Sequence, residues 1–256
     1  MNKIACITGA SSGFGEACAL KFAEQHVDVI ITGRRKDRLD ALKKKIEETQ
    51  DAKVWVVPMD VRNRSAVFEA VASLPEAWKK IDVLVNNAGL ALGRDNFDEA
   101  SLDDWDTMID TNVKGLLYMS RAVLPLMIPN NRGHIINIGS TAAKQVYQKG
   151  NVYCASKHAV DAISQAMRID LLQHKIKVTA IHPGAAETEF SMVRLKHDGQ
   201  EAKKVYEGYE PLRAADIAEI VFFAASRPAH VCINELEVTC LAQANAFYLF
   251  KEPGNV

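Results

Sequence analysis

The sequence of 256 residues lacks the features that mark membrane and secreted proteins. Its apolar runs stop well short of the roughly 18 residues that a membrane-spanning helix needs. Its first ten residues, MNKIACITGA, lack the successive charged, apolar and small-residue regions of a secretory signal. We therefore expect a cytoplasmic protein that does not bind a membrane.

An excess of one sign of charge is also missing, because 31 Lys and Arg residues are balanced by 32 Asp and Glu residues. The basic residues are spread along the chain, and this distribution offers no patch for nucleic acid or an anionic surface. The expected partner is a small-molecule substrate, with no nucleic acid.

Patterns that would indicate disulfides or a metal are absent as well. The five cysteines are an odd number with no CxxC pair, which is typical of reduced thiols. The seven histidines show no ligand spacing with cysteines or clustered carboxylates, and metal sites combine several such groups. We expect no catalytic metal.

What the sequence does contain is an alternation of short apolar runs and amphipathic segments. The runs that indicate buried strands cover residues 3–8, 27–32, 53–57, 81–86, 134–139, 178–183 and 235–239. Segments with helical periodicity lie between them, for example at 16–25, 36–48, 64–74, 103–127 and 158–173. This alternation predicts an α/β fold of the Rossmann type, with a doubly wound, mostly parallel seven-stranded sheet and helices on both faces. No linker interrupts it, so we expect a single domain over residues 1–256.

One segment, residues 184–211, departs from the alternation. It carries no clear strand and holds the mixed-charge stretch VRLKHDGQEAKKVYEGYE. Long segments after a strand in such folds are often lids over a ligand, although a surface helical hairpin fits the sequence equally well. We predict a substrate loop here.

The first predicted strand leads into ITGASSGFGE, which contains Gly9, Gly13 and Gly15. Glycines in a strand-to-helix turn allow the backbone to approach a pyrophosphate at the amino end of the helix. Such a turn can also serve a merely structural close contact. Its position in the first βαβ unit favours a dinucleotide.

The end of the second predicted strand indicates which dinucleotide binds. An NAD enzyme would place an acidic residue there to bond the ribose, whereas this sequence has Arg34 and Arg35. Two cations at the amino end of a helix oppose its dipole unless an anion lies between them. A ribose 2′-phosphate is such an anion, so we predict NADP, with Arg34 the better placed of the two.

A tyrosine, a lysine and a serine could carry acid–base chemistry. Tyr153 and Lys157 are four residues apart, and Ser140 precedes Tyr153 by 13 residues. Residues at positions i and i+4 share one helix face, although such a pair can equally be packing with a snorkelling lysine. Lowering a tyrosine pKa by about three units requires roughly 4 kcal/mol. One cation about 4 Å away at an effective dielectric of about 20 supplies that amount.

The ordered motifs TGASSGFG, GRR, MDV, NNAG, DTNVKG, GHIINIGS, YCASK and HPGAAET resemble those of the short-chain dehydrogenase/reductase family over nearly the whole chain. The resemblance implies that Tyr153 is the acid/base and that Lys157 lowers its pKa and bonds the nicotinamide ribose. It implies that Ser140 orients the substrate and that Asn112 holds a water connecting Lys157 to solvent. The implied cofactor-binding residues are Gly9, Ser11, Ser12, Gly13, Phe14, Gly15, Arg34, Arg35, Asp60, Val61, Asn87, Ala88, Gly89, Tyr153, Lys157, Pro183, Gly184 and Thr188.

Within the family, phrases such as MDVRNR, NNAGLALG and TEFSMVR are similar to NADP-dependent 3-hydroxy acid dehydrogenases that oxidise serine and allo-threonine. A hydroxy acid carries a carboxylate, for which Arg194, Lys196, Lys144 and Lys149 are the available cations. Together with Ser140 and Tyr153, we predict Arg194 as a substrate residue, although it could be a solvated loop arginine. Ala185 and Ala186 depart from the pattern and leave the substrate's size open.

The expected function is hydride transfer between NADP and the secondary alcohol or ketone of a small 3-hydroxy acid. Alternatives are a carbonyl reductase for an oxoacyl, sugar or dicarbonyl substrate, and a non-catalytic NADP-sensing regulator. The resemblance also implies a homotetramer or homodimer, with the segments 103–127 and 158–173 pairing between subunits.

Overall fold

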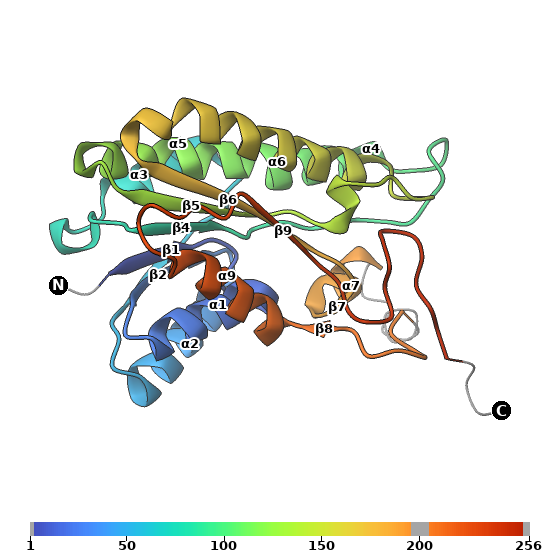
Figure 1. Ribbon diagram of the computed structural model, residues 1–256, viewed down its shortest axis with the longest axis horizontal. Coiled ribbons are helices and arrows are strands. Elements are labelled where there is room, and N and C mark those ends of the chain that lie inside the picture. Colours follow the sequence, from blue (N-terminus) through green and yellow to red (C-terminus); the bar gives the residue numbers. More distant parts are fainter. Residues whose placement is uncertain (1–2, 196–204, 253–256) are drawn as a thin grey trace.

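A computed structural model describes residues 3–195 and 205–252. Seven strands form the central sheet, in the order β3-β2-β1-β4-β5-β6-β9 (Figure 1), and every neighbouring pair is parallel. Their bounds are β1 (Ile4–Ile7), β2 (Asp28–Gly33), β3 (Val54–Pro58), β4 (Val83–Asn86), β5 (Gly133–Ile138), β6 (Ile176–Pro183) and β9 (Glu235–Val238). The doubly wound sheet predicted from the sequence is confirmed.

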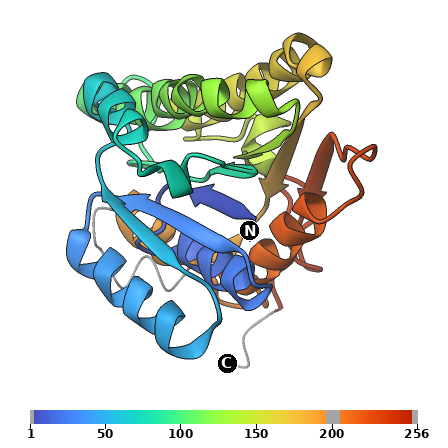
Figure 2. The same cartoon turned by 90° about the vertical axis from the view of Figure 1, so that its left-hand side faces the viewer.

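Helices cover both faces of the sheet. The helices are α1 (Gly13–Glu24), α2 (Lys36–Thr49), α3 (Arg64–Ala72), α4 (Leu102–Ile109), α5 (Leu116–Met127), α6 (Asn151–Asp170), α7 (Glu189–Arg194) and α9 (Ala214–Ala225). Figures 1 and 2 show α3, α4, α5 and α6 on one face and α1, α2 and α9 on the other. One buried apolar cluster lies under each layer. Strands β1, β4 and β5 are buried along their whole length, which explains why they have no polar face.

Shorter turns connect these elements. They are η1 (Glu76–Trp78), η2 (Asp110–Gly115), η3 (Ile128–Asn130), η4 (Thr141–Ala143) and η5 (Leu172–His174). A two-stranded parallel sheet pairs β7 (Ala186–Glu187) with β8 (Leu212–Arg213). Among the described helices, none is both long and apolar enough to cross a membrane.

The continuous helix predicted for residues 103–127 is wrong in one respect. It is divided into α4 and α5 by η2, which is a turn of π-helix. Within this wider turn the side chain of Asn112 is buried and bonds to the backbone of Leu90 at both its amide nitrogen and its oxygen. Such turns are frequent at functional sites, and apolar periodicity does not distinguish them from an α-helix.

The segment 184–211 contains more regular structure than predicted. It holds β7 and helix α7, and β8 follows directly after it. A two-residue strand such as β7 is too short to show a periodicity, so no sequence pattern predicts it. Residues 196–204, including Lys196, lie outside the described part of the chain.

Candidate active site

A cleft of about 1380 Å³ opens at the carboxyl ends of the parallel strands. Ligands of doubly wound sheets bind at this edge, where the strand order reverses. Here β1 lies between β2 and β4, so the glycine turn after β1 is at the point of reversal. The volume exceeds the roughly 300–1,000 Å³ of pockets for drug-sized ligands.

The turn between β1 and α1 requires glycine at several positions. Gly9 and Gly13 have φ of +66° and +56°, a region that L side chains rarely adopt. A Cβ on Gly15 would lie 2.3 Å from the carbonyl oxygen of Gly9. The backbone can therefore approach a ligand closely at the amino end of α1, where the helix dipole favours an anion.

The two arginines after β2 occupy different surroundings. Arg35 donates hydrogen bonds to Ser11 and Ser12, with its NH2 group 2.7 Å from Ser12 Oγ, and pairs with Glu189 at 3.0 Å. Arg34 is exposed and lines the cleft. Arg35 is thus bonded to the glycine turn, while Arg34 is an exposed cation on the wall of the cleft.

Asp60, after β3, lines the same cleft and accepts hydrogen bonds from Arg62. Burial alone would raise the pKa of Asp60, but the bonds from Arg62 and the charge of Arg34 together hold it below its ordinary value. Asp60 is therefore an ionised acceptor at neutral pH. The signal that could have identified Arg62 is its position two residues after Asp60 in MDVR.

The turn after β4 is bonded to the first strand. Asn87 donates from Nδ2 to the carbonyl oxygens of Thr8 and Gly9, at 2.8 and 3.2 Å. The hydroxyl of Thr8 accepts from the backbone of Asn87 and Ala88. These bonds fix the NNAG turn to the glycine turn, so both form one wall of the cleft.

Ser140, Tyr153 and Lys157 meet at the centre of the cleft. Ser140 caps η4 after β5, and helix α6 begins at Asn151, which places Tyr153 and Lys157 on successive turns of its first half. Lys157 Nζ lies 5.9 Å from the centroid of the Tyr153 ring and donates to the carbonyl oxygen of Ile138 at 2.9 Å. Tyr153 and Lys157 are both buried.

Burial alters the acidity of both helix residues. It raises the pKa of Tyr153, an effect that the charge of Tyr147 increases and that a hydrogen bond with Ser140 and the charge of Arg194 oppose. Burial lowers the pKa of Lys157 to about 8. At neutral pH the chain therefore presents a protonated phenol beside a charged amine. In the protein without cofactor, burial outweighs the lowering of the Tyr153 pKa that the sequence predicts.

Asn112 reaches the same place from the π-turn η2. Its amide donates to the carbonyl oxygen of Leu90 at 2.8 Å and to Ser156 Oγ at 3.0 Å, and its oxygen accepts from Leu90 N at 2.8 Å. Both amide donors are used. The oxygen Oδ1 has two lone pairs and accepts one bond, from Leu90 N, so one lone pair remains available. A Cβ on Gly89 would lie 3.2 Å from this oxygen and 3.5 Å from Lys157 Nζ, so both groups lie close to the same point of the NNAG turn.

Arg194, at the end of α7, extends over the tyrosine rings. Its guanidinium carbon lies 5.5 Å from the Tyr153 ring centroid and 5.6 Å from that of Tyr147, and NH1 donates to the Tyr147 hydroxyl at 3.1 Å. Its Nε is buried and has no hydrogen-bond partner among the residues that the structure describes. A cation with an unused donor next to Tyr153 is suited to an anionic substrate group.

Most residues predicted from the sequence line this cleft. Those on its wall are Gly9, Ser11, Ser12, Gly13, Phe14, Arg34, Arg35, Asp60, Val61, Asn87, Ala88, Gly89, Ser140, Lys149, Tyr153, Lys157, Pro183, Gly184, Thr188 and Arg194. Gly15 and Asn112 support the wall from behind, through the contacts described above. Lys144 does not serve the cleft, because it forms ion pairs with Asp161 and Glu235 instead.

Several lining residues had no signal in the sequence. Tyr147 and Arg94 face the cleft from loops, and Gln243 and Phe247 come from the segment after β9. Loops without periodicity or a motif give no indication of where they fold. Only their tertiary contacts identify them.

A model of the short chain dehydrogenase family matches residues 3–199. The chain belongs to this family. The resemblance seen in the sequence motifs is therefore confirmed.

Several short chain dehydrogenases are similar over almost the full length. The NADP-dependent 3-hydroxy acid dehydrogenase YdfG of Salmonella typhi is 52% identical over 244 residues, which are 95% of this chain and 97% of that protein. Sulfoacetaldehyde reductase 2 of Chromohalobacter salexigens is 43% identical over 95% of this chain and 96% of its own. The solved closed form of serine dehydrogenase complexed with NADP+ is 47% identical, with a TM-score of 0.91 over 98% of this chain and 100% of that one.

Proposed function

We propose that this short chain dehydrogenase transfers hydride between NADP and the secondary alcohol or ketone of a small 3-hydroxy acid, of the serine, allo-threonine or 3-hydroxyisobutyrate type. The observation that carries the proposal is the convergence of Ser140, Tyr153 and Lys157 beside Arg194 in one cleft. The names of the similar 3-hydroxy acid and serine dehydrogenases support the same reaction.

The cleft fits NADP at both ends of the cofactor. The positive φ of Gly9 and Gly13 and the amino end of α1 suit a pyrophosphate, and the exposed guanidinium of Arg34 suits a 2′-phosphate. Thr188 lies across the cleft mouth close to Gly13. A Cβ added to Gly13 would be 3.5 Å from the Cβ of Thr188. When bound, NADP supplies the hydride chemistry.

The side chains of the cleft supply the proton and the orientation. Tyr153 donates its proton to the carbonyl oxygen during reduction and accepts one from the hydroxyl during oxidation. The charge of Lys157 stabilises the phenolate that forms, and Ser140 bonds the substrate oxygen. Asn112 offers the remaining lone pair of Oδ1 to a water that exchanges protons with Lys157.

Arg194 binds the acidic group of the substrate. The guanidinium matches a carboxylate in bidentate geometry, and its contact with the Tyr147 hydroxyl holds it above Tyr153. Because a sulfonate offers the same charge and acceptors, a sulfonated aldehyde is a second candidate substrate, which also agrees with the similar sulfoacetaldehyde reductase.

A substrate panel tests the reaction. We expect NADP reduction with L-serine, L-allo-threonine or 3-hydroxyisobutyrate, and a loss of kcat of about 10²–10⁴-fold in Tyr153→Phe, because the acid/base is removed. Activity is followed by NADPH absorbance, with a panel of neutral ketones and sulfoacetaldehyde in parallel. Turnover unaffected by Tyr153→Phe would refute the mechanism. Tight NADPH binding without turnover of any substrate would favour a sensor.

A second experiment tests the choice of cofactor. Arg34→Leu removes charge-assisted hydrogen bonds worth about 1.5–3 kcal/mol, so we expect the KM for NADP to rise by about 10- to 100-fold while the KM for NAD is unchanged. Lys36→Leu is the matched control, because Lys36 is an exposed cation two residues further along the chain and pairs with Asp40. Equal losses with NAD and NADP would contradict a phosphate role for Arg34.

We further propose that residues 1–256 form one domain, that segment 184–211 is its substrate loop, and that the protein acts in the cytoplasm as a homotetramer or homodimer. The loop proposal is supported by Thr188 and Arg194, which both line the cleft. Exposed apolar side chains on α4, α5 and α6 support the assembly.

A further inference from the structure

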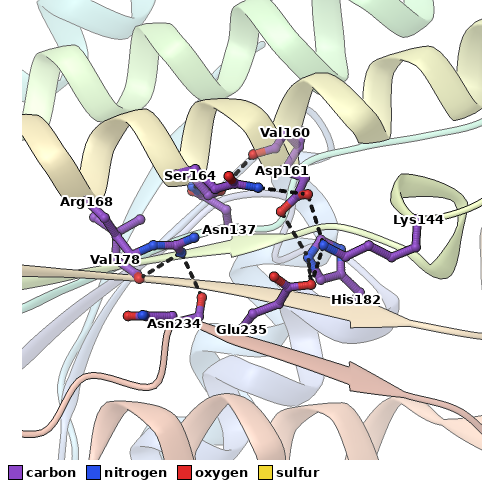
Figure 3. A network of polar contacts seen from close by, with 11 residues as sticks. Asn137, Lys144, Val160, Asp161, Ser164, Arg168, Val178, His182, Asn234 and Glu235 are labelled. Carbon is purple, nitrogen blue, oxygen red and sulfur yellow. Dashed lines mark hydrogen bonds and ion pairs between the residues drawn. The ribbon is translucent and has the colours of Figure 1, made fainter.

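Four charged or titratable side chains from four elements meet close to the cleft (Figure 3). His182 lies at the end of β6, Asp161 on α6 and Glu235 on β9, and Lys144 follows η4. His182 Nε2 is 3.6 Å from Asp161 Oδ1 and 3.5 Å from Glu235 Oε1. Lys144 Nζ is 2.9 Å from Asp161 Oδ2 and also pairs with Glu235. We call these four residues the His182 cluster.

Lys144 supplies a positive charge to the two carboxylates of the His182 cluster. Ligand atoms of Asp161, His182 and Glu235 all lie within 4.8 Å of one another, an arrangement that could hold a metal ion. However, the ammonium of Lys144 already pairs with both carboxylates. The imidazole of His182 is fully buried, and its nearest charged neighbours are the other three members. The geometry favours ion pairs between Lys144 and the two carboxylates, with His182, whose pKa burial lowers, as a neutral imidazole beside them.

His182 packs against the residue that precedes Ser140. A Cβ on Gly139 would lie only 2.3 Å from His182 Nδ1, so the imidazole touches the backbone there. On the preceding residue, the carbonyl oxygen of Ile138 accepts the hydrogen bond from Lys157 Nζ. The end of β5, which leads to Ser140, is therefore contacted by His182 at Gly139 and by Lys157 at Ile138.

Asp161 connects this strand end to the helix that carries the acid–base pair. Tyr153, Lys157 and Asp161 follow one another at intervals of four on α6 and so share one face. The partner of Asp161, Lys144, comes immediately after η4, the turn that Ser140 caps. The ion pair of Asp161 with Lys144 therefore joins α6 to the far end of the segment 138–144.

We propose that His182 and Asp161 are positioning residues, which fix Ser140 relative to Tyr153 and Lys157 through the His182 cluster. The proposal rests on the proposed function, because it assigns a role within that reaction. Neither residue touches the substrate. Their effect is on the alignment of the serine hydroxyl, to which reaction rates are sensitive at the level of about 1 Å.

The test compares His182→Gln and Asp161→Asn with His134→Gln. His134 is a matched control because it is also buried and pairs with Thr179 at 2.7 Å, but it lies at the start of β5, at the opposite end of the sheet. We expect both test variants to lose about tenfold in kcat per NADPH-binding site, with the KM for NADPH within about twofold of the wild type. Binding sites are counted by NADPH fluorescence, and thermal unfolding is measured on all variants.

Counting sites separates positioning from stability, because a merely destabilising change lowers the number of intact sites and leaves turnover per site unchanged. Lys144→Gln is the substitute variant if His182→Gln does not fold. It removes the ion pairs of the same cluster at a side chain that is 26% exposed, so it should disturb folding less. We expect it to lose about threefold in kcat per site.

Turnover per site equal to that of His134→Gln in all three variants would overturn the proposal. Loss of wild-type activity on dialysis against EDTA, with recovery on adding Zn²⁺, would overturn it in favour of a metal site. A wild type that turns over no substrate would instead refute the proposed function, so the two failures are distinguishable.

Discussion

At the scale of single residues, burial changes the pKa values of the tyrosine and the lysine in the site in opposite directions. Tyr153 has a raised pKa and Lys157 a pKa lowered to about 8, both because they are buried. A protonated phenol can donate a proton to a carbonyl but cannot accept one from an alcohol. The protein alone is therefore prepared for reduction at neutral pH.

This arrangement predicts opposite pH dependences for the two directions. Ketone reduction needs a charged Lys157, which is lost as the pH rises through about 8, so kcat for reduction should fall above that pH. Alcohol oxidation needs the phenolate, so its rate should rise with pH. The measurement is kcat in both directions between about pH 6 and pH 10, with activity after return to pH 7 as the control for denaturation. Parallel profiles in the two directions would contradict this assignment.

The same scale shows what sequence could supply about the site. Tyr153, Lys157, Ser140 and the glycines were predicted because motif spacing fixes them on a helix face or at a strand end. His182 has no cysteine or clustered carboxylate at metal-ligand spacing in the sequence, so the sequence pattern assigns it no role. Its partners Asp161 and Glu235 come from other elements, and only the packing of β6 between β5 and β9 brings them together.

At the scale of elements, the strands were more predictable than the segments between them. Strands β1, β4 and β5 have continuous apolar runs because the sheet is covered on both faces there, whereas β9 at the edge alternates Glu with apolar residues. The π-turn η2 has no such signature, since it changes the helical period for one turn only. Its consequence is functional, because it directs Asn112 at Leu90 and places the amide oxygen near Lys157.

Also at this scale, helix α6 begins seven residues earlier than the periodic segment that starts at residue 158. Its first two turns carry Lys157, which is buried and lines the cleft, and the polar Asn151, which accepts a hydrogen bond from Trp105, so their apolar periodicity is weak. Local pattern and functional demand conflict here. Such conflicts are expected at sites where chemistry overrides folding preference.

At the scale of the whole molecule, the helical layer of α4, α5 and α6 leaves large apolar side chains in contact with solvent. Leu102, Leu117, Ile169 and Leu172 are exposed by 69%, 40%, 76% and 76%. Isolated exposed apolar residues are common, but several on neighbouring helices indicate a surface that a partner covers. A second copy of this chain is the partner that the proposed homotetramer or homodimer provides.

The assembly can be tested through this helical layer. We expect light scattering after gel filtration to give a mass of two or four times the 28.2 kDa of one chain. The double variant Leu117→Asp, Ile169→Asp should shift that mass toward the monomer, because an unpaired carboxylate is costly to bury in an interface. Phe223→Asp, at a 46% exposed site on α9 on the other face of the sheet, is the control and should keep the wild-type mass. A wild-type mass of one chain would refute the assembly, and an unchanged mass in the double variant would place the interface elsewhere.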